Sequence, residues 1–156
     1  MIVLLFYFIE YKVLGFGADK SNDWGVMMSI KILIADDSDT LRMELKTIFK
    51  DEGYTLLEAC DGREAIKALE QNLDVSIVFS DLNMPNTSGM DLLKWVRAQE
   101  QLAKTPFCFL SAISSKETIS EGNKLGANAW IIKPPHKDSL KKFVHRLIEK
   151  HNLKAS

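Results

Sequence analysis

Residues 75–85, VSIVFSDLNMP, decide the fold of this chain. The run from Val75 to Ser80 is short and mostly apolar on both of its faces, and Asp81 follows it directly, four residues before Pro85. A strand that is apolar on both faces is typical of a parallel sheet covered by helices on both sides. The stretch therefore predicts a central parallel strand with a carboxylate at its end.

Four similar apolar runs flank this strand. They lie at residues 30–35, 55–59, 107–110 and 129–132, and an amphipathic stretch follows each of the five runs. Such alternation is typical of βα units around a parallel sheet, so we predict an α/β fold.

Helices are predicted at about residues 40–52, from Asp61 onward, at 89–100, at 116–125 and at 137–151. Asp61 with Glu64 three residues later has the spacing of a capping box. The stretch at 116–125 is the poorest helix, because Gly122 and Asn123 lie inside it and a glycine there costs about 1 kcal/mol relative to alanine. We expect this helix to be loose.

The composition is that of one globular domain. The chain has 156 residues, of which 46% are hydrophobic and 26% charged, and its net charge is -1. No overall charge favours a nucleic-acid partner. Cys60 and Cys108 lie in apolar runs without a metal-ligand or disulfide spacing, so we expect two buried thiols in a reducing cytoplasm.

Residues 1–28 stand apart from the predicted domain, which covers residues 29–156. Their apolar run from Ile2 to Ile9 is too short to span a bilayer, which takes about 20 apolar residues. Two interpretations stay open: a weak apolar anchor, or a misassigned start with translation beginning at Met27 or Met28. We favour the second and expect no membrane association.

Polar side chains follow the strands at the edge where α/β proteins bind ligands. They are Asp36 and Asp37 after the first strand, Asp81 after the third, Ser111 after the fourth and Lys133 after the fifth. Three crowded carboxylates repel one another unless a cation lies between them. Mg²⁺ is the natural cation here, because it prefers oxygen ligands and commonly binds phosphate as well. Together, the ion, Lys133 and a carboxylate could support phosphoryl transfer to an aspartate.

Taken in order, five motifs resemble the receiver domain of response regulators, most closely its single-domain chemotaxis type (CheY-like). The motifs are Asp36-Asp37, Asp81-Leu82-Asn83-Met84-Pro85 with Gly89, Ser111-Ala112, Gly126-Ala127, and Trp130-Ile131-Ile132-Lys133-Pro134. The resemblance implies a flavodoxin-like, doubly wound, five-stranded parallel sheet in the order 2-1-3-4-5 with five flanking helices. It also implies a cis bond between Lys133 and Pro134.

The resemblance assigns a role to each site residue. Asp81 would accept the phosphoryl group and, with Asp37 and the backbone carbonyl of Asn83, ligate Mg²⁺, while Asp36 would act through water. Lys133 would pair with Asp81 or its phosphate. Ser111 would be the switch hydroxyl and Trp130 the switch aromatic, where the family more often has threonine and tyrosine or phenylalanine.

The implied function is that of a cytoplasmic response regulator in a two-component system or phosphorelay, and not an enzyme beyond its own Mg²⁺-dependent phosphorylation and dephosphorylation. The phosphoryl donor would be a histidine kinase or a histidine phosphotransfer protein. A target protein would bind the face formed by the fourth helix, fifth strand and fifth helix, whose last helix is basic.

Three alternatives remain. The acidic residues from Asp37 to Asp39 could simply cap the first helix. Asp37-Ser38-Asp39-Thr40 also resembles the nucleophile loop of haloacid-dehalogenase-type phosphatases, which would make Asp37 the phosphorylated residue. Finally, the fold could serve as an interaction module that works without phosphorylation.

Overall fold

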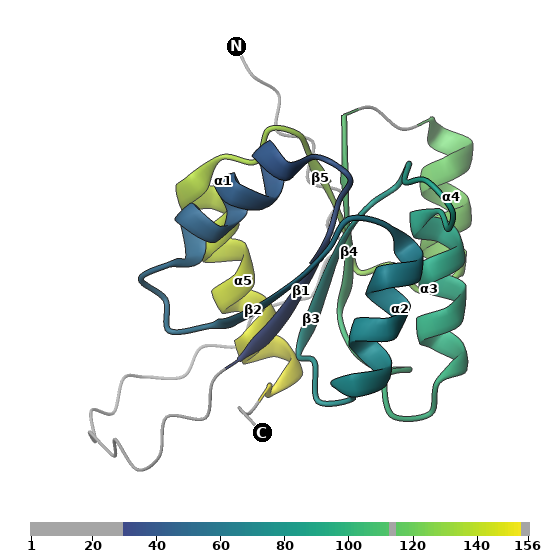
Figure 1. The fold of residues 1–156 in the computed structure, drawn as a ribbon, viewed down its shortest axis with the longest axis horizontal. Helices are drawn as coiled ribbons and strands as arrows, with labels where there is room; N and C mark the ends of the chain where they lie inside the picture. Colours follow the sequence, from purple (N-terminus) through teal and green to yellow (C-terminus); the bar gives the residue numbers. More distant parts are fainter. Residues whose placement is uncertain (1–29, 113–114, 154–156) are drawn as a thin grey trace, which may run out of the picture.

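The computed structural model describes residues 30–112 and 115–153, and the predictions for residues 1–28 lie outside this part of the chain (Figure 1). Strands and helices alternate strictly along it. In chain order they are β1 (Lys31–Ala35), α1 (Asp39–Phe49), β2 (Thr55–Ala59), α2 (Gly62–Gln71), β3 (Ile77–Asp81), α3 (Gly89–Ala98), β4 (Phe107–Ser111), α4 (Lys116–Lys124), β5 (Ala129–Ile132) and α5 (Lys137–His151).

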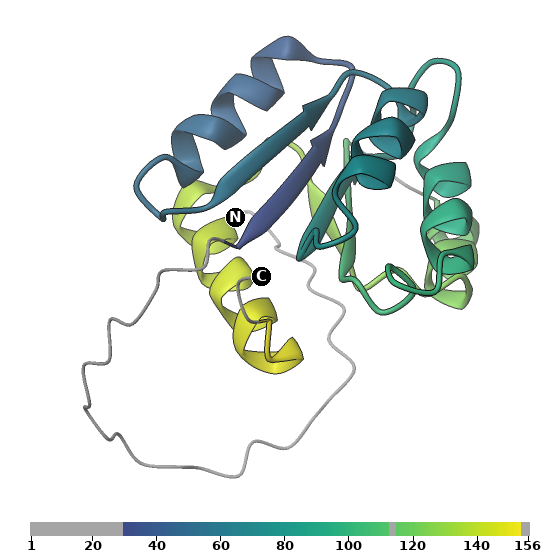
Figure 2. The same cartoon turned by 60° about the horizontal axis from the view of Figure 1, so that its bottom comes forward.

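The five strands form one parallel sheet in the order β2-β1-β3-β4-β5, which confirms the predicted topology. Helices α1 and α5 cover one face of this sheet, and α2, α3 and α4 cover the other (Figures 1 and 2). All five residues of β3 and of β4 are buried, as expected for strands between two layers of helices.

The sheet separates two hydrophobic cores. Alternate residues of each strand point to opposite faces, so Ile77 and Phe79 pack with α1 and α5, whereas Val78 packs with α2 and α3. In β4, Cys108 and Leu110 belong to the first core and Phe109 to the second. Successive apolar residues of β3 and of β4 therefore belong alternately to the two cores.

Side-chain caps fix where the helices begin. Oxygen atoms of Ser38, Asp61, Ser88 and Ser115 accept hydrogen bonds from backbone N–H groups in the first turn of α1 to α4. The predicted capping box is present in part: the Glu64 N–H donates to the N-cap Asp61, but the Glu64 carboxylate accepts from the N–H of Cys60, one residue before the N-cap.

Several predicted boundaries shift by a few residues. Helix α1 ends at Phe49, because residues 50–53 form a turn in which Gly53 has a φ of 71°. Strands β3 and β4 include Asp81 and Ser111 as their last residues, where we expected both to follow the strands. Regular sheet pairing therefore fixes the backbone of both residues.

Other sequence-based expectations have mixed outcomes. Cys108 is buried, but Cys60 is exposed, because it follows β2 at the open edge of the sheet. The Lys133-Pro134 bond is cis, as the resemblance implied. Within the described residues, no helix is long and apolar enough to cross a membrane.

Candidate metal centre

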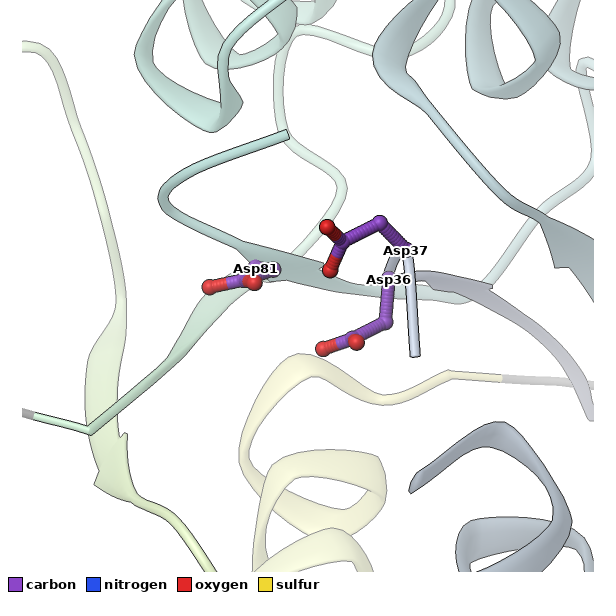
Figure 3. A group of neighbouring side chains, drawn as sticks. All are labelled: Asp36, Asp37 and Asp81. Carbon is purple, nitrogen blue, oxygen red and sulfur yellow. The ribbon is translucent and has the colours of Figure 1, made fainter. Parts of the chain in front are cut away.

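Three carboxylates meet at the carboxyl end of the sheet. Asp36 and Asp37 follow β1, Asp81 ends β3, and one oxygen of each side chain lies within 4.8 Å of the others (Figure 3). The strands β1 and β3 are neighbours in the sheet, with Ala35 opposite Ser80, so their ends bring these residues together. The predicted acidic cluster is thus present.

Asp36 is the most enclosed of the three. Its side chain has no exposed surface, and its Oδ1 accepts a hydrogen bond from the Ser38 N–H at 2.9 Å. The Asp81 side chain is 12% exposed, whereas Asp37 is exposed. The cluster therefore runs from a buried carboxylate to one that faces solvent.

Lys133 neutralises part of this negative charge. Its Nζ lies 2.6 Å from Asp36 Oδ2 and 2.9 Å from Asp81 Oδ2. Burial acts to lower the pKa of Lys133, but the two carboxylates outweigh it and raise that pKa. The ammonium therefore stays charged across physiological pH.

Ser111 is placed beside the cluster by the sheet register. Leu110 lies opposite Asp81, so Ser111 extends one residue further toward the site, and its side chain is enclosed. The carbonyl oxygen of Ser111 accepts a hydrogen bond from the Lys133 N–H at 3.0 Å. This bond fixes the backbone that carries the lysine next to the end of β4.

The segment after β3 is anchored to the start of α2 at two points. Asn86, with a φ of 63°, donates from its side-chain amide to Asp61 Oδ2 at 2.5 Å. A β-carbon at Gly62 would lie 2.4 Å from the Thr87 carbonyl oxygen, so only glycine permits this close approach. The start of α2 therefore holds the loop that contains Asn83, whose N–H points to Asp81 Oδ1 at 3.4 Å.

Capping does not account for the acidic pair. Helix α1 is capped by Ser38, whose Oγ accepts from the Leu41 N–H at 3.3 Å. Asp39 pairs with Arg42. Asp36 and Asp37 are therefore not the N-cap of this helix, which removes the simplest alternative for their presence.

Trp130 lies apart from the carboxylates. Its ring stacks on Phe109 with 4.4 Å between centroids, on the sheet face that α4 covers. The site thus brings together Asp36, Asp37, Asp81, Lys133 and the end of β4, while the predicted switch aromatic belongs to the neighbouring core.

The donor set fits a hard divalent cation. Three carboxylates face a single ammonium, so the cluster keeps an excess of two negative charges that a divalent ion would balance. All side-chain donors are oxygens, as Mg²⁺ prefers, and the exposed Asp37 leaves room for retained water. These residues fit Mg²⁺.

Two supporting residues were not identified as such from the sequence. Asp61 was assigned to a helix cap alone, although it also binds Asn86. Asn86 carries one usable signal, since asparagine tolerates a left-handed backbone better than most residues do. No local pattern reports the contact between them, which joins positions 25 residues apart.

Comparisons with known proteins identify the family to which this chain is similar. A family model described as the response regulator receiver domain matches residues 32–145. Chemotaxis protein CheY-3 of Vibrio cholerae is 37% identical over 123 residues, which make up 78% of this chain and 94% of that protein. Chemotaxis protein CheY of Pseudomonas aeruginosa is 35% identical over 124 residues, 79% of this chain and 99% of that protein.

Solved structures give the same result. The high-resolution structure of Vibrio cholerae chemotaxis protein CheY4, crystallised at low pH, superposes with a TM-score of 0.72 at 34% sequence identity. The match covers 76% of this chain and 98% of that one.

Proposed function

The chain belongs to the response regulator receiver domain family, and from this membership we propose that it is a response regulator that accepts a phosphoryl group on Asp81. The observation that carries the proposal is the position of Asp81. It ends the central strand, lies beside the carboxylates of Asp36 and Asp37, and has the Lys133 ammonium 2.9 Å away.

The proposed reaction is an in-line displacement at phosphorus. A carboxylate oxygen of Asp81 forms the new P–O bond, while the bond from phosphorus to the donor's imidazole nitrogen breaks and its electron pair leaves with the imidazole. Lys133 balances negative charge on the phosphoryl oxygens, and the Ser111 hydroxyl donates a hydrogen bond to one of them. The product is an acyl phosphate on Asp81.

Mg²⁺ would neutralise the phosphoryl oxygens and hold them in place. Asp37, Asp81 and the carbonyl of Asn83 would hold the ion, with Asp36 acting through water. The enclosed Asp36 would also orient Lys133, to which it is paired at 2.6 Å. The loop carrying Asn83 is held at Asn86, which supports a defined position for that carbonyl.

As a switch, the domain would change the surface formed by α4, β5 and α5, where a target protein would bind. Ile132 at the end of β5 is 58% exposed. On α5, Lys142, Arg146 and Lys150 are also exposed. An exposed apolar side chain on β5 together with exposed cations on α5 suits a partner with an acidic, partly apolar surface.

The donor would be a histidine kinase or a histidine phosphotransfer protein, and the site of action the cytoplasm. Both cysteines are free thiols, which accords with a reducing compartment. Members of this family are response regulators and not classical enzymes. Self-catalysed phosphorylation from small donors, and slow self-catalysed hydrolysis, belong to the proposal.

Intact mass after incubation with acetyl phosphate tests the proposal, with and without Mg²⁺, for the native chain and for Asp81→Asn. We expect one Mg²⁺-dependent phosphoryl group on the native chain and none on the variant. Labelling that persists in Asp81→Asn and disappears in Asp37→Asn would instead support the phosphatase-type site. No labelling, under conditions that label another receiver domain, would support a module that works without phosphorylation.

A further inference from the structure

The Trp130 indole is held by α4 as well as by the sheet. Its Nε1–H donates a hydrogen bond to Asn123 Oδ1 at 3.0 Å, and its ring stacks on Phe109 at an interplanar angle of 28°. Asn123 belongs to α4 and Trp130 to β5. One hydrogen bond therefore links the helix and the strand that form part of the proposed target-binding surface.

Gly122 provides the space that the indole occupies. A β-carbon at this buried position would lie 2.5 Å from Trp130 Cζ2, 3.2 Å from Met90 Cε and 3.3 Å from Phe109 Cε2. The first distance is shorter than real β-carbons tolerate, so any larger residue would displace the ring. Phe109 has no exposed surface, whereas Trp130 is half-buried, so the indole is the group free to move outward.

We propose that Asn123 is a positioning residue which, together with the space left at Gly122, holds the Trp130 indole inward against Phe109 before any phosphoryl group is bound. The proposal rests on the role of Trp130 as switch aromatic in the proposed function. It also explains why α4 keeps two residues of poor helix propensity side by side. Both contact or accommodate the indole.

The energy of this arrangement is small enough for a switch. The Asn123–Trp130 hydrogen bond is exposed to water, which competes for both partners, so its contribution lies at the low end for hydrogen bonds. Losing it should lower the ratio of inward to outward indole about two- to fivefold. A two-state element with a bias of this size responds to a modest further input.

Helix propensity and indole positioning predict opposite effects of one substitution. Replacing Asn123 by alanine improves the intrinsic propensity of α4. If Asn123 were merely a weak helix residue, Asn123→Ala would leave the Trp130 environment unchanged or make it tighter. If Asn123 positions the indole, the same change exposes the ring. The two interpretations are therefore separable in the unphosphorylated protein.

The experiment uses the full chain with Trp24→Phe and Trp95→Phe, which leaves Trp130 as its one indole. Acrylamide quenching and the emission maximum report how exposed the ring is. We expect Asn123→Ala to raise quenching and shift emission to longer wavelength, and Asn123→Asp, which keeps the acceptor oxygen, to restore most of the native values. Ser120→Ala, an exposed change on the same helix, should alter neither value.

Gly122→Ala tests independently whether the space beside Gly122 holds the Trp130 indole inward. We expect it to expose the indole more than Asn123→Ala does, with circular dichroism confirming that the fold is retained. Native quenching in Asn123→Ala overturns the proposal, whatever Gly122→Ala shows. Because both measurements are made without phosphate, they can fail while acetyl phosphate still labels Asp81, and they can succeed if it does not.

Adding acetyl phosphate and Mg²⁺ then connects the indole to the switch. The native indole is already inward, so we expect a small change in quenching on phosphorylation. In Asn123→Ala the phosphoryl group has a larger outward population to recover, so the change should be greater. An equal change in both proteins would contradict an inward bias set by Asn123.

Discussion

Gly89 lies directly against the backbone of Asp81. A β-carbon at Gly89 would be 2.1 Å from the Asp81 carbonyl oxygen and 3.0 Å from Phe109 Cε1, and the Gly89 N–H donates to the Leu82 carbonyl at 2.9 Å. The first turn of α3 is thereby seated on the end of β3. The residue proposed to receive the phosphoryl group is positioned by a glycine eight residues later in the chain.

Gly89→Ala should therefore disturb both folding and the site. The added methyl group overlaps backbone atoms that cannot move independently of β3, so we expect the free energy of unfolding to fall by about 1–3 kcal/mol. Labelling of Asp81 by acetyl phosphate should slow as well. Urea denaturation and intact mass measure the two effects, and Lys94→Ala, at an exposed position of α3, serves as the control.

The Asp61–Asn86 hydrogen bond offers a test of loop anchoring. The pKa of Asp61 is lowered first by its bond to the Glu64 N–H and then by Asn86, so its carboxylate serves both partners. Asp61→Ser keeps an N-cap acceptor for α2 but loses the bond to Asn86. Asn86→Gly keeps the positive φ and loses the same bond.

We expect both variants to weaken Mg²⁺ binding severalfold in calorimetric titration, since one hydrogen bond of about 1 kcal/mol holds the loop that carries Asn83. The double variant should be no worse than either single one, because the two changes remove one interaction. Additive losses, or native Mg²⁺ affinity in both single variants, would contradict anchoring of the metal loop by this contact.

Lys133→Met tests the charge balance of the site. Removing the ammonium leaves the fully enclosed Asp36 carboxylate beside Asp81 without a counter-charge. Because Lys133 is 20% exposed, we expect a loss of about 2 kcal/mol, below the range for a wholly buried pair.

Mg²⁺ should raise the thermal midpoint of Lys133→Met by more than that of the native chain, since the ion binds only the folded state and replaces the missing charge. Asp37→Asn should reduce the increase in both backgrounds. Thermal unfolding with and without Mg²⁺ measures this, and an identical increase in all four proteins would mean that the ion acts elsewhere.

The ion pairs of Glu52, on the sheet face opposite α4, predict that the free energy of unfolding depends on pH. Lys141 Nζ lies 2.6 Å from Glu52 Oε1 and His145 Nε2 lies 2.8 Å from Glu52 Oε2, which ties the turn after α1 to α5. The hydrogen bond from Lys141 lowers the pKa of Glu52, burial opposes it, and His145 adds to the lowering.

A lowered pKa means that the folded chain binds this proton less readily than the unfolded chain. The stabilisation is therefore complete above the ordinary value of 4.5 and is lost as pH falls through the folded-state pKa. Glu52→Gln should cost about 1 kcal/mol near neutral pH and nothing at lower pH. Urea denaturation of the native chain and of Glu52→Gln, from neutral pH to below the folded-state pKa, measures this, with the exposed Glu70→Gln as control. A difference in the free energy of unfolding that stays constant with pH would contradict the prediction.

Much of the fold followed from local patterns. Strand β5 and helix α5 begin and end as predicted, because the apolar stripe of α5 and the short run before Lys133 are unambiguous. The grouping of Asp36, Asp81 and Lys133 followed from one general rule, that parallel strands present their carboxyl ends at one edge.

The remaining features depend on contacts between distant parts of the chain. From the sequence alone, Gly122 and Asn123 indicate only a weak helix. The structure shows that Gly122 leaves space for the Trp130 indole and that Asn123 accepts its hydrogen bond. Cys60 was expected to be buried because it adjoins an apolar run, but the sheet order places β2 at an edge. Secondary-structure propensity and local apolar pattern describe one segment at a time. The contacts of α4 and the exposure of Cys60 depend on which other segments pack beside them.

The interleaving of the two hydrophobic cores along β3 and β4 has a consequence for genetic tolerance. In a scan of substitutions along β3, second-site changes that rescue a defect at Val78 should lie in α2 and α3. Those that rescue a defect at Ile77 or Phe79 should lie in α1 and α5. Compensatory changes would then pair positions by the side of the sheet they face. Adjacent codons of one strand would belong to two different networks of epistasis.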